Sequence, residues 1–215
     1  MSWSTIHSAA DAAGLIVMGV VEDEDTGTIA LLGTGPTFWS VFTASPEYGD
    51  GNPHPVDRWS KRVIGAMAAQ VGASCSYPSD GPPYPPFIRW SIETGRFFQS
   101  PVGMMVHDTV GMLLSLRGAL HLADHVAVVP IETASPCLTC VDQPCTTACP
   151  VGALSADAPY DVSACHGFLD TEAGKSCMLG GCAARLACPI SAGAQRPPAQ
   201  SALHMLSFHP GGDIT

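Results

Sequence analysis

The chain has 215 residues, of which 46% are apolar and only 13% are charged. This composition can bury a substantial core and excludes the intrinsically disordered class. Nine Lys and Arg residues against nineteen Asp and Glu residues give a formal charge of -10. Because phosphate binding depends on clustered cations, we expect no nucleic-acid partner.

Two features of the sequence bear on location. No basic segment followed by an apolar run stands near the start of the chain, so we expect no secretory signal. The longest apolar stretch, 102–120, is interrupted by His107, Asp108 and Arg117, so we expect no membrane span. These features together predict a cytoplasmic protein.

The first part of the chain alternates helical and extended patterns. We expect a helix over 6–13 and strands over 15–21, 29–32 and 38–42. Pro55 opens an amphipathic helix that ends near Gly72. Five prolines in 77–86 predict an ordered loop, followed by a short helix through Trp90, strands over 104–106 and 112–122, and an apolar run over 126–131. This order predicts an α/β (α+β) domain with a mixed sheet.

The cysteines divide the chain into two predicted domains. Eight of the nine lie between Cys137 and Cys188, so we place a boundary near Thr133, with domains over 1–132 and 133–215. The second domain is expected to be a small helix-and-loop module. From Gly193 onward the chain is rich in Pro, Gln, Ala and Ser, which predicts an irregular tail.

The cysteine spacing is the sharpest signal of chemistry. One set reads Cys137-x2-Cys140-x4-Cys145-x3-Cys149-Pro150, and the other reads Cys165-x11-Cys177-x4-Cys182-x5-Cys188-Pro189. A 4Fe-4S cluster needs four thiolates around one small volume, and in two-cluster proteins the last cysteine of a run binds the other cluster. The spacing therefore predicts one cluster on Cys137, Cys140, Cys145 and Cys188, and a second on Cys149, Cys165, Cys177 and Cys182.

Two other interpretations of these cysteines remain open. A zinc site also uses thiolates, but it usually presents paired CxxC units, and only Cys137 and Cys140 have that spacing. Disulfides suit an even number of cysteines but not a reducing compartment. Cys75 lies outside the pattern and is expected to be a small buried apolar side chain.

The cysteine-rich part resembles the two-cluster ferredoxin module of epoxyqueuosine reductases and reductive dehalogenases. In that group a run ending in Cys-Pro is followed by an isolated cysteine after a turn, here Asp161-Val-Ser-Ala-Cys165, and then by a final trio, here Cys177, Cys182 and Cys188. The resemblance implies a bacterial-ferredoxin-like module with two 4Fe-4S clusters.

Short segments of the first domain are similar to the same group. They are Ala12-Ala-Gly-Leu-Ile-Val-Met-Gly19 and Val106-His-Asp-Thr-Val-Gly111. Gly35-Pro-Thr37 and Leu116-Arg-Gly118 resemble the cobalamin-processing family of methylmalonic aciduria and homocystinuria type C, which has a nitroreductase-like core. The resemblance implies a corrinoid pocket, with Gly35, Pro36, Thr37, His107 and Arg117 as candidate cofactor-binding residues.

Each of these candidates also has a structural interpretation. The segment 33–36 could let a cofactor approach the backbone or could be an ordinary turn. His107 beside Asp108 could be an acid–base pair, a cofactor contact or part of a capped turn. Arg117 interrupts an apolar strand, so it either pairs with a carboxylate or binds an anionic ligand.

Two functions fit the sequence. The first is an oxidoreductase that passes electrons through two 4Fe-4S clusters to a corrinoid, cobalamin, or a similar cofactor in the first domain. The second is a ferredoxin-like electron carrier whose first domain only docks a partner. Both imply a redox partner protein or a small-molecule reductant.

Overall fold

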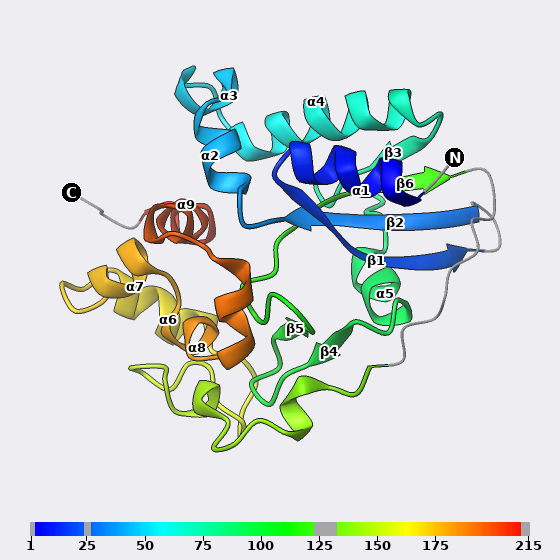
Figure 1. Cartoon of the computed structure of the whole chain (residues 1–215). Coiled ribbons are helices and arrows are strands. Elements are labelled where there is room, and N and C mark those ends of the chain that lie inside the picture. The colour runs from blue at the N-terminus through cyan, green and yellow to red at the C-terminus, as the bar shows by residue number, and fades with distance from the viewer. Residues whose placement is uncertain (1–2, 24–26, 123–132, 212–215) are drawn as a thin grey trace. The chain divides into compact units, whose positions relative to one another are not determined.

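The computed structural model describes residues 3–23, 27–122 and 133–211, which form two units (Figure 1). The first unit contains the described residues up to Phe97 and those between Ser115 and Thr133. The second contains Phe98–Leu114 and the described residues from Ala134 onward. The sequence predicted a single boundary near Thr133, whereas the segment 98–114 groups with the cysteine-rich part.

A four-stranded antiparallel sheet forms the centre of the first unit. Its strands lie in the order β1 (Leu15–Asp23), β2 (Gly27–Thr34), β6 (Leu116–Leu122) and β3 (Ser74–Ser76). The expected combination of helices and strands is therefore confirmed, and β1 and β2 form where the apolar runs predicted them. The strand expected over 112–122 begins only at Leu116, and the run expected over 126–131 lies outside the described residues.

A mixed sheet was expected, but every described strand pair in this sheet is antiparallel. The reason lies in the strand order. β2 and β3 point in the same direction and are joined through a helical connection, as in a parallel unit. However, β6 lies between them and runs the opposite way, so the two parallel strands are not neighbours.

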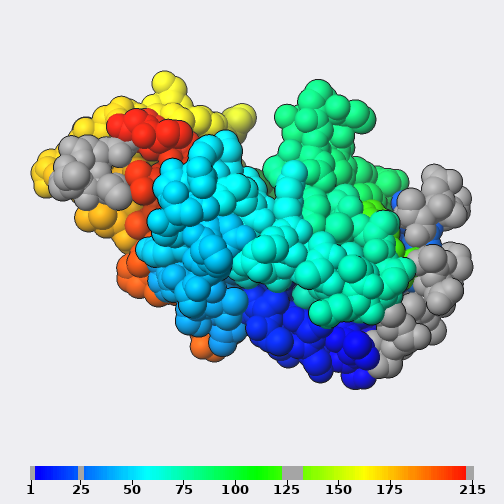
Figure 2. All heavy atoms as spheres, turned by 90° about the horizontal axis from the view of Figure 1, so that it is seen from above, coloured from blue at the N-terminus to red at the C-terminus, as the bar shows by residue number. Residues whose placement is uncertain are grey.

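Helices cover both faces of this sheet. Helices α1 (Trp3–Ala12) and α4 (Pro55–Gln70) lie on one face, and α5 (Phe87–Glu93) lies on the other (Figure 1). Figure 2 looks down on the first helical layer, where α1 (dark blue) lies beside α4 (turquoise). Because both faces are covered, all eight residues of β2 are buried.

The strand expected over 38–42 is a helix. Helix α2 (Phe38–Thr43) is followed by the short α3 (Pro46–Gly49). Phe38 and Phe42 are four residues apart, so helical geometry places their rings on one face, where they stack with centroids 5.4 Å apart. Both rings also contact Trp59 of α4 edge-on. This shared contact overrides the β propensity of the aromatic residues.

The second unit is built from short elements. A small antiparallel pair, β4 (Phe97–Gln99) and β5 (Met105–His107), leads into it. Its helices are η1 (Pro136–Leu138), η2 (Pro144–Thr146), α6 (Val162–Leu169), α7 (Lys175–Gly180), α8 (Ala183–Leu186), η3 (Pro189–Ala194) and α9 (Pro198–Phe208). Across the described part of the chain, no helix is long and apolar enough to cross a membrane.

The prediction of an irregular tail after Gly193 is wrong for most of that segment, because α9 occupies 198–208. Proline at the first helical position fits this start, since its fixed φ and missing N–H cost nothing there. Gln200, Ser201 and Met205 are buried on one face, and α9 packs against α7. Helical periodicity therefore matters more here than the low-complexity composition.

An ion pair joins the helical layer of the first unit. The carboxylate of Glu47 on α3 is buried and accepts two bonds from Arg62 on α4, from Nε at 2.5 Å and from Nη2 at 2.9 Å. These bonds hold the pKa of Glu47 down at about 2. The carboxylate therefore stabilises the fold as an anion, and this contribution requires deprotonation.

Replacing Glu47 tests this contribution. We expect Glu47→Gln to lower the free energy of unfolding at pH 7 by about 1 kcal/mol, because half-exposed Arg62 loses a charged acceptor. The folded-state pKa lies below the unfolded one, so the parent loses this stabilisation as the pH falls from about 4.5 to about 2. Urea unfolding at pH 7 and pH 3 should show the gap narrowing. Glu93→Gln, at an exposed pair 4.0 Å long, should have little effect at either pH.

Candidate metal centre

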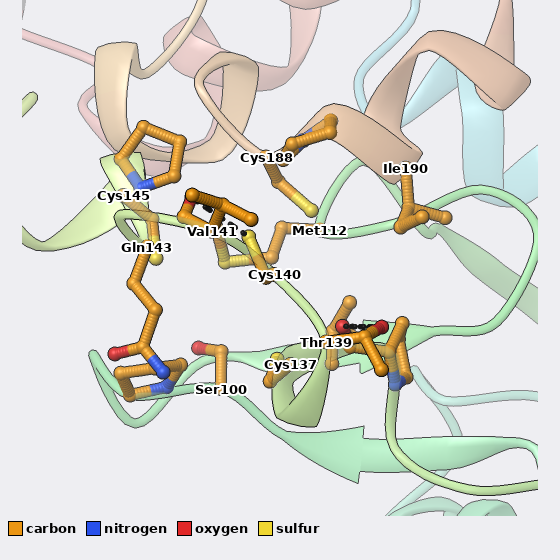
Figure 3. A pocket seen from close by; sticks show the side chains of 15 residues that line it. Ser100, Met112, Cys137, Thr139, Cys140, Val141, Gln143, Cys145, Cys188 and Ile190 are labelled. Carbon is orange, nitrogen blue, oxygen red and sulfur yellow. Dashed lines mark hydrogen bonds between the residues drawn. The ribbon is translucent and has the colours of Figure 1, made fainter.

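Four cysteines of the second unit line a first hollow of about 330 Å³. Figure 3 shows their side chains around this space, together with Met112 and Ile190. The four are Cys137, Cys140, Cys145 and Cys188.

Short helical turns hold these cysteines. Cys137 lies on η1. Its backbone N–H donates to Oγ of Ser135, the N-cap residue of this turn, at 3.3 Å. Cys145 lies on η2, and Cys188 immediately precedes Pro189 at the start of η3. Proline at the start of a 3₁₀ turn fixes the backbone φ angle there, so the cysteine before or after it has a restricted backbone conformation.

The other four cysteines line a second hollow of about 120 Å³, also within the second unit. Cys165 lies on α6, which is capped by Asp161 through a bond from the N–H of Ala164 to Oδ1 at 2.9 Å. Cys177 lies on α7, and Cys182 is the N-cap residue of α8. The set is completed by Cys149, which follows η2.

The two sets are the same two sets of four that the cysteine spacing predicts. In each, one member comes from the other cysteine run, Cys188 in the first set and Cys149 in the second. The two hollows are adjacent, because Cys145 and Cys188 share an apolar cluster with Cys149 and Cys182. Fully buried Ala184 belongs to that same cluster.

The cysteines of a set interact electrostatically with one another. Burial raises the pKa of Cys137 and Cys145, and the neighbouring sulfurs of Cys140 and Cys188 raise it further. In the second set, burial likewise raises the pKa of Cys165 and Cys182, and members of that set add to the effect.

Polar contacts in the second set act in the opposite direction. The hydroxyl of Tyr160 forms a hydrogen bond with Cys165, and the backbone N–H groups of Arg185 and Ala184 lie near Cys182, whose side chain makes no capping hydrogen bond. Each of these contacts lowers the pKa of the sulfur that it touches. Burial also raises the pKa of Tyr160, so this side chain remains a hydrogen-bond donor.

The sulfurs surround spaces instead of meeting at a point. Within the described residues, no three His, Cys, Asp or Glu side chains are close enough to ligate a single metal ion. A 4Fe-4S cubane binds one thiolate at each iron, so its four ligands surround a volume. All nine cysteines are described, and each is a free thiol.

The segment 112–114 is tied to the helices that carry the last cysteines. Arg185 Nε donates to the carbonyl of Met112 at 2.6 Å, and its Nη2 donates to that of Leu114 at 3.2 Å. Ser191 Oγ accepts from Met112 N at 3.1 Å and donates to the carbonyl of Arg185 at 2.8 Å. Arg196 donates to the carbonyl of Leu113. These bonds explain why 98–114 belongs to the cysteine-rich unit.

Two glycines allow this segment to lie close to η3. Gly111 has a left-handed φ of 59°, and a side chain there would meet the backbone of Ser191. A Cβ on Gly193 would overlap the carbonyl oxygen of Thr109. The wall of the first hollow that contains Met112 is therefore set by direct backbone packing.

The candidate cofactor segment 35–37 is a turn in the first unit. Gly35 donates its N–H to the carbonyl of Gly14 at 2.9 Å, and its carbonyl accepts from Phe38 N at 3.1 Å. A Cβ on Gly35 would be 3.0 Å from Ile16. Pro36 and Thr37 are exposed. These contacts match the ordinary-turn interpretation.

Arg117 pairs with a carboxylate. Its Nη1 is 3.4 Å from Asp57 Oδ1 on the first turn of α4, and burial lowers the pKa of Arg117. Gly33 pairs with Leu116 across β2 and β6, so Gly35 and Arg117 lie toward the same end of the sheet. The structural alternative foreseen for Arg117 accounts for its contact.

His107 belongs to the second unit. The other cofactor candidates, Gly35, Pro36, Thr37 and Arg117, belong to the first. His107 is fully buried, and its Nδ1 accepts from Thr109 N at 3.2 Å. Asp108 Oδ1 is also 3.2 Å from Nδ1.

Cys75, which was expected to be buried, is only partly buried, and its sulfur lies 3.1 Å from the hydroxyl oxygen of Tyr77.

Sequence reasoning missed two residues at the second hollow, Tyr160 and Arg185. The only available signal was position: Arg185 follows Cys182 by three residues, and Tyr160 precedes Cys165 by five.

No protein-family model, curated protein or solved structure matches this chain.

A substitution at Gly193 tests the packing beside the first hollow. We expect Gly193→Ala to lower the thermal midpoint of the second unit, because the methyl group collides with the Thr109 carbonyl. Gly167→Ala is the matched control, since a Cβ there meets nothing within 4 Å and the residue lies inside α6. That change should stabilise the protein by about 0.5–1 kcal/mol. Equal midpoints for the parent and Gly193→Ala would contradict the packing argument.

Proposed function

We propose that this chain is an iron–sulfur redox protein with two 4Fe-4S clusters. The first would be held by Cys137, Cys140, Cys145 and Cys188, and the second by Cys149, Cys165, Cys177 and Cys182. The observation that carries the proposal is the gathering of eight cysteines, four and four, around two adjacent hollows. When bound, such clusters supply one-electron storage and transfer.

The chain's own residues have a defined part in this function. The cysteines would hold the group, the Tyr160 hydroxyl forms a hydrogen bond with Cys165, and the backbone N–H groups at the start of α8 lie near Cys182. Hydrogen bonds to ligating sulfur stabilise negative charge on it. The apolar lining of Val106, Met112 and Ile190 limits water at the first hollow.

An oxidoreductase is the form of this function that we favour. The first unit has a sheet with helices on both faces and a core of its own, which is more than an electron carrier needs. The resemblance of 35–37 and 116–118 to cobalamin-processing proteins implies that the electron acceptor is a corrinoid. The first domain would then be nitroreductase-like and the second ferredoxin-like. Electrons would come from a redox partner protein or a small-molecule reductant.

One observation favours the electron-carrier alternative. Leu138 and Val141 flank Cys140 and are 80% and 78% exposed, which is unusual for apolar side chains. Asp142 follows directly, and residues 134–174 contain five Asp or Glu and no Lys or Arg. An apolar spot within an acidic surface suits a protein partner with a basic rim.

Metal analysis of anaerobically purified protein tests the proposal. We expect about eight irons and about eight sulfides per chain. Cys145→Ser should lose iron and visible absorbance, because it removes a buried ligand. Cys75→Ser removes the one cysteine outside both hollows and should retain the full iron content. Zinc in place of iron in the parent protein would contradict the proposal.

A titration with cob(II)alamin separates the enzyme from the carrier. If the first unit binds a corrinoid, adding the iron-loaded protein should change the absorbance and EPR spectrum of the cobalt. Flavin and nicotinamide should be tried in parallel. Loaded clusters that are reduced by dithionite, together with no binding of any of the three cofactors, would favour the carrier.

A further inference from the structure

A cation lines the second hollow. Arg185 is part of its wall, three residues after Cys182 on α8. The side chain is partly buried and donates to the carbonyls of Met112 and Leu114. Burial lowers the pKa of Arg185, while the nearby Cys182 sulfur and Tyr160 oxygen raise it. A guanidinium stays charged in proteins, so this wall carries a fixed positive charge.

The contacts of Arg185 do not neutralise that charge. Both of its hydrogen-bond partners are neutral carbonyl groups, and among the described residues no carboxylate lies within ion-pair distance of it. Cations withdrawn from water are normally paired with an anion. Cys182, a member of the second set, is near enough for its sulfur to interact with the charge of the guanidinium.

The first hollow has a different electrostatic character. Its lining contains the four cysteines together with apolar and neutral polar side chains, and it includes no Lys or Arg. A group of the same charge would therefore meet a cation at the second hollow and none in the wall of the first.

We propose that Arg185 compensates the negative charge of the cluster at the second hollow and sets its reduction potential above that of the first. The inference rests on the proposed function. Taking up an electron makes a thiolate-ligated cluster more negative, so nearby positive charge stabilises the reduced form. Arg185 is a positioning and tuning residue in this scheme, and it does not bind iron.

The test is an EPR-monitored redox titration of the full-length, iron-loaded protein with dithionite. The signal of the second cluster is identified by its change in Cys165→Ser. In Arg185→Met, the ratio of reduced to oxidised second cluster at a fixed potential should fall at least tenfold, which is about 59 mV for a one-electron couple. The first cluster, whose wall Arg185 reaches only through the Met112 carbonyl, should shift less than the second. Arg185→Lys keeps the charge and should restore most of the ratio.

Arg196→Met is the matched control for the loss of hydrogen bonds. Arg196 also donates to a carbonyl of the 112–114 segment, that of Leu113, but it lies in the wall of neither hollow. Its replacement should leave the second cluster's titration unchanged. Equal shifts in Arg185→Met and Arg196→Met would assign the effect to the segment's anchoring and overturn the proposal.

Two further outcomes are decisive. An unchanged titration in an Arg185→Met protein with full iron content would overturn the role of Arg185 while leaving the two clusters in place. If Arg185→Met loses the second cluster, the comparison passes to neutral Arg185→Gln and charged Arg185→Lys, and equal titrations of those two would overturn the proposal. A parent protein without iron would instead refute the proposed function itself.

Discussion

Four thiols that share a partly buried hollow cannot all ionise at low cost. Burial and the neighbouring sulfurs both raise the pKa of Cys137 and Cys145, so each thiolate makes the next one harder to form. A group that brings positive charge to all four sulfurs reverses this penalty, because thiolates are then its ligands. Without such a group the four sulfurs remain neutral thiols, so the arrangement of the second unit favours thiolates only when a positively charged group is bound.

The order of the cysteines along the chain couples the two sets. The first set takes Cys188 from the end of the second cysteine run, and the second set takes Cys149 from the end of the first run. Neither hollow can be completed until η2, α8 and η3 pack together, and those elements meet at buried Ala184. Filling one hollow therefore restricts the backbone at the other, and the two sites are expected to form cooperatively.

Sequence reasoning worked where local pattern and tertiary packing agree. Pro55 and a stripe of apolar residues define α4, and the apolar runs define β1 and β2. It failed where a distant partner decides the structure. By local pattern Phe38 and Phe42 are strand residues, but in the structure they lie on a helix and pack against Trp59. By local pattern 98–114 belongs to the first domain, but Arg185 and Ser191 bind its last residues to the second unit. Such partners lie 17 to 79 residues away along the chain and leave no local signal.

The candidate site divides in the same way. The cysteine spacing could be interpreted because ligands of one cluster obey a rule of order, so the grouping into four and four needed no coordinates. Arg185 obeys no such rule, since its importance comes from the hollow that it lines and from the absence of a carboxylate partner among the described residues. If an electron reaches the chain near exposed Leu138 and Val141, beside the first set, the charge of Arg185 would favour its transfer from the first cluster to the second. A difference in local charge, built by one side chain, would then give direction to a path between two otherwise similar sites.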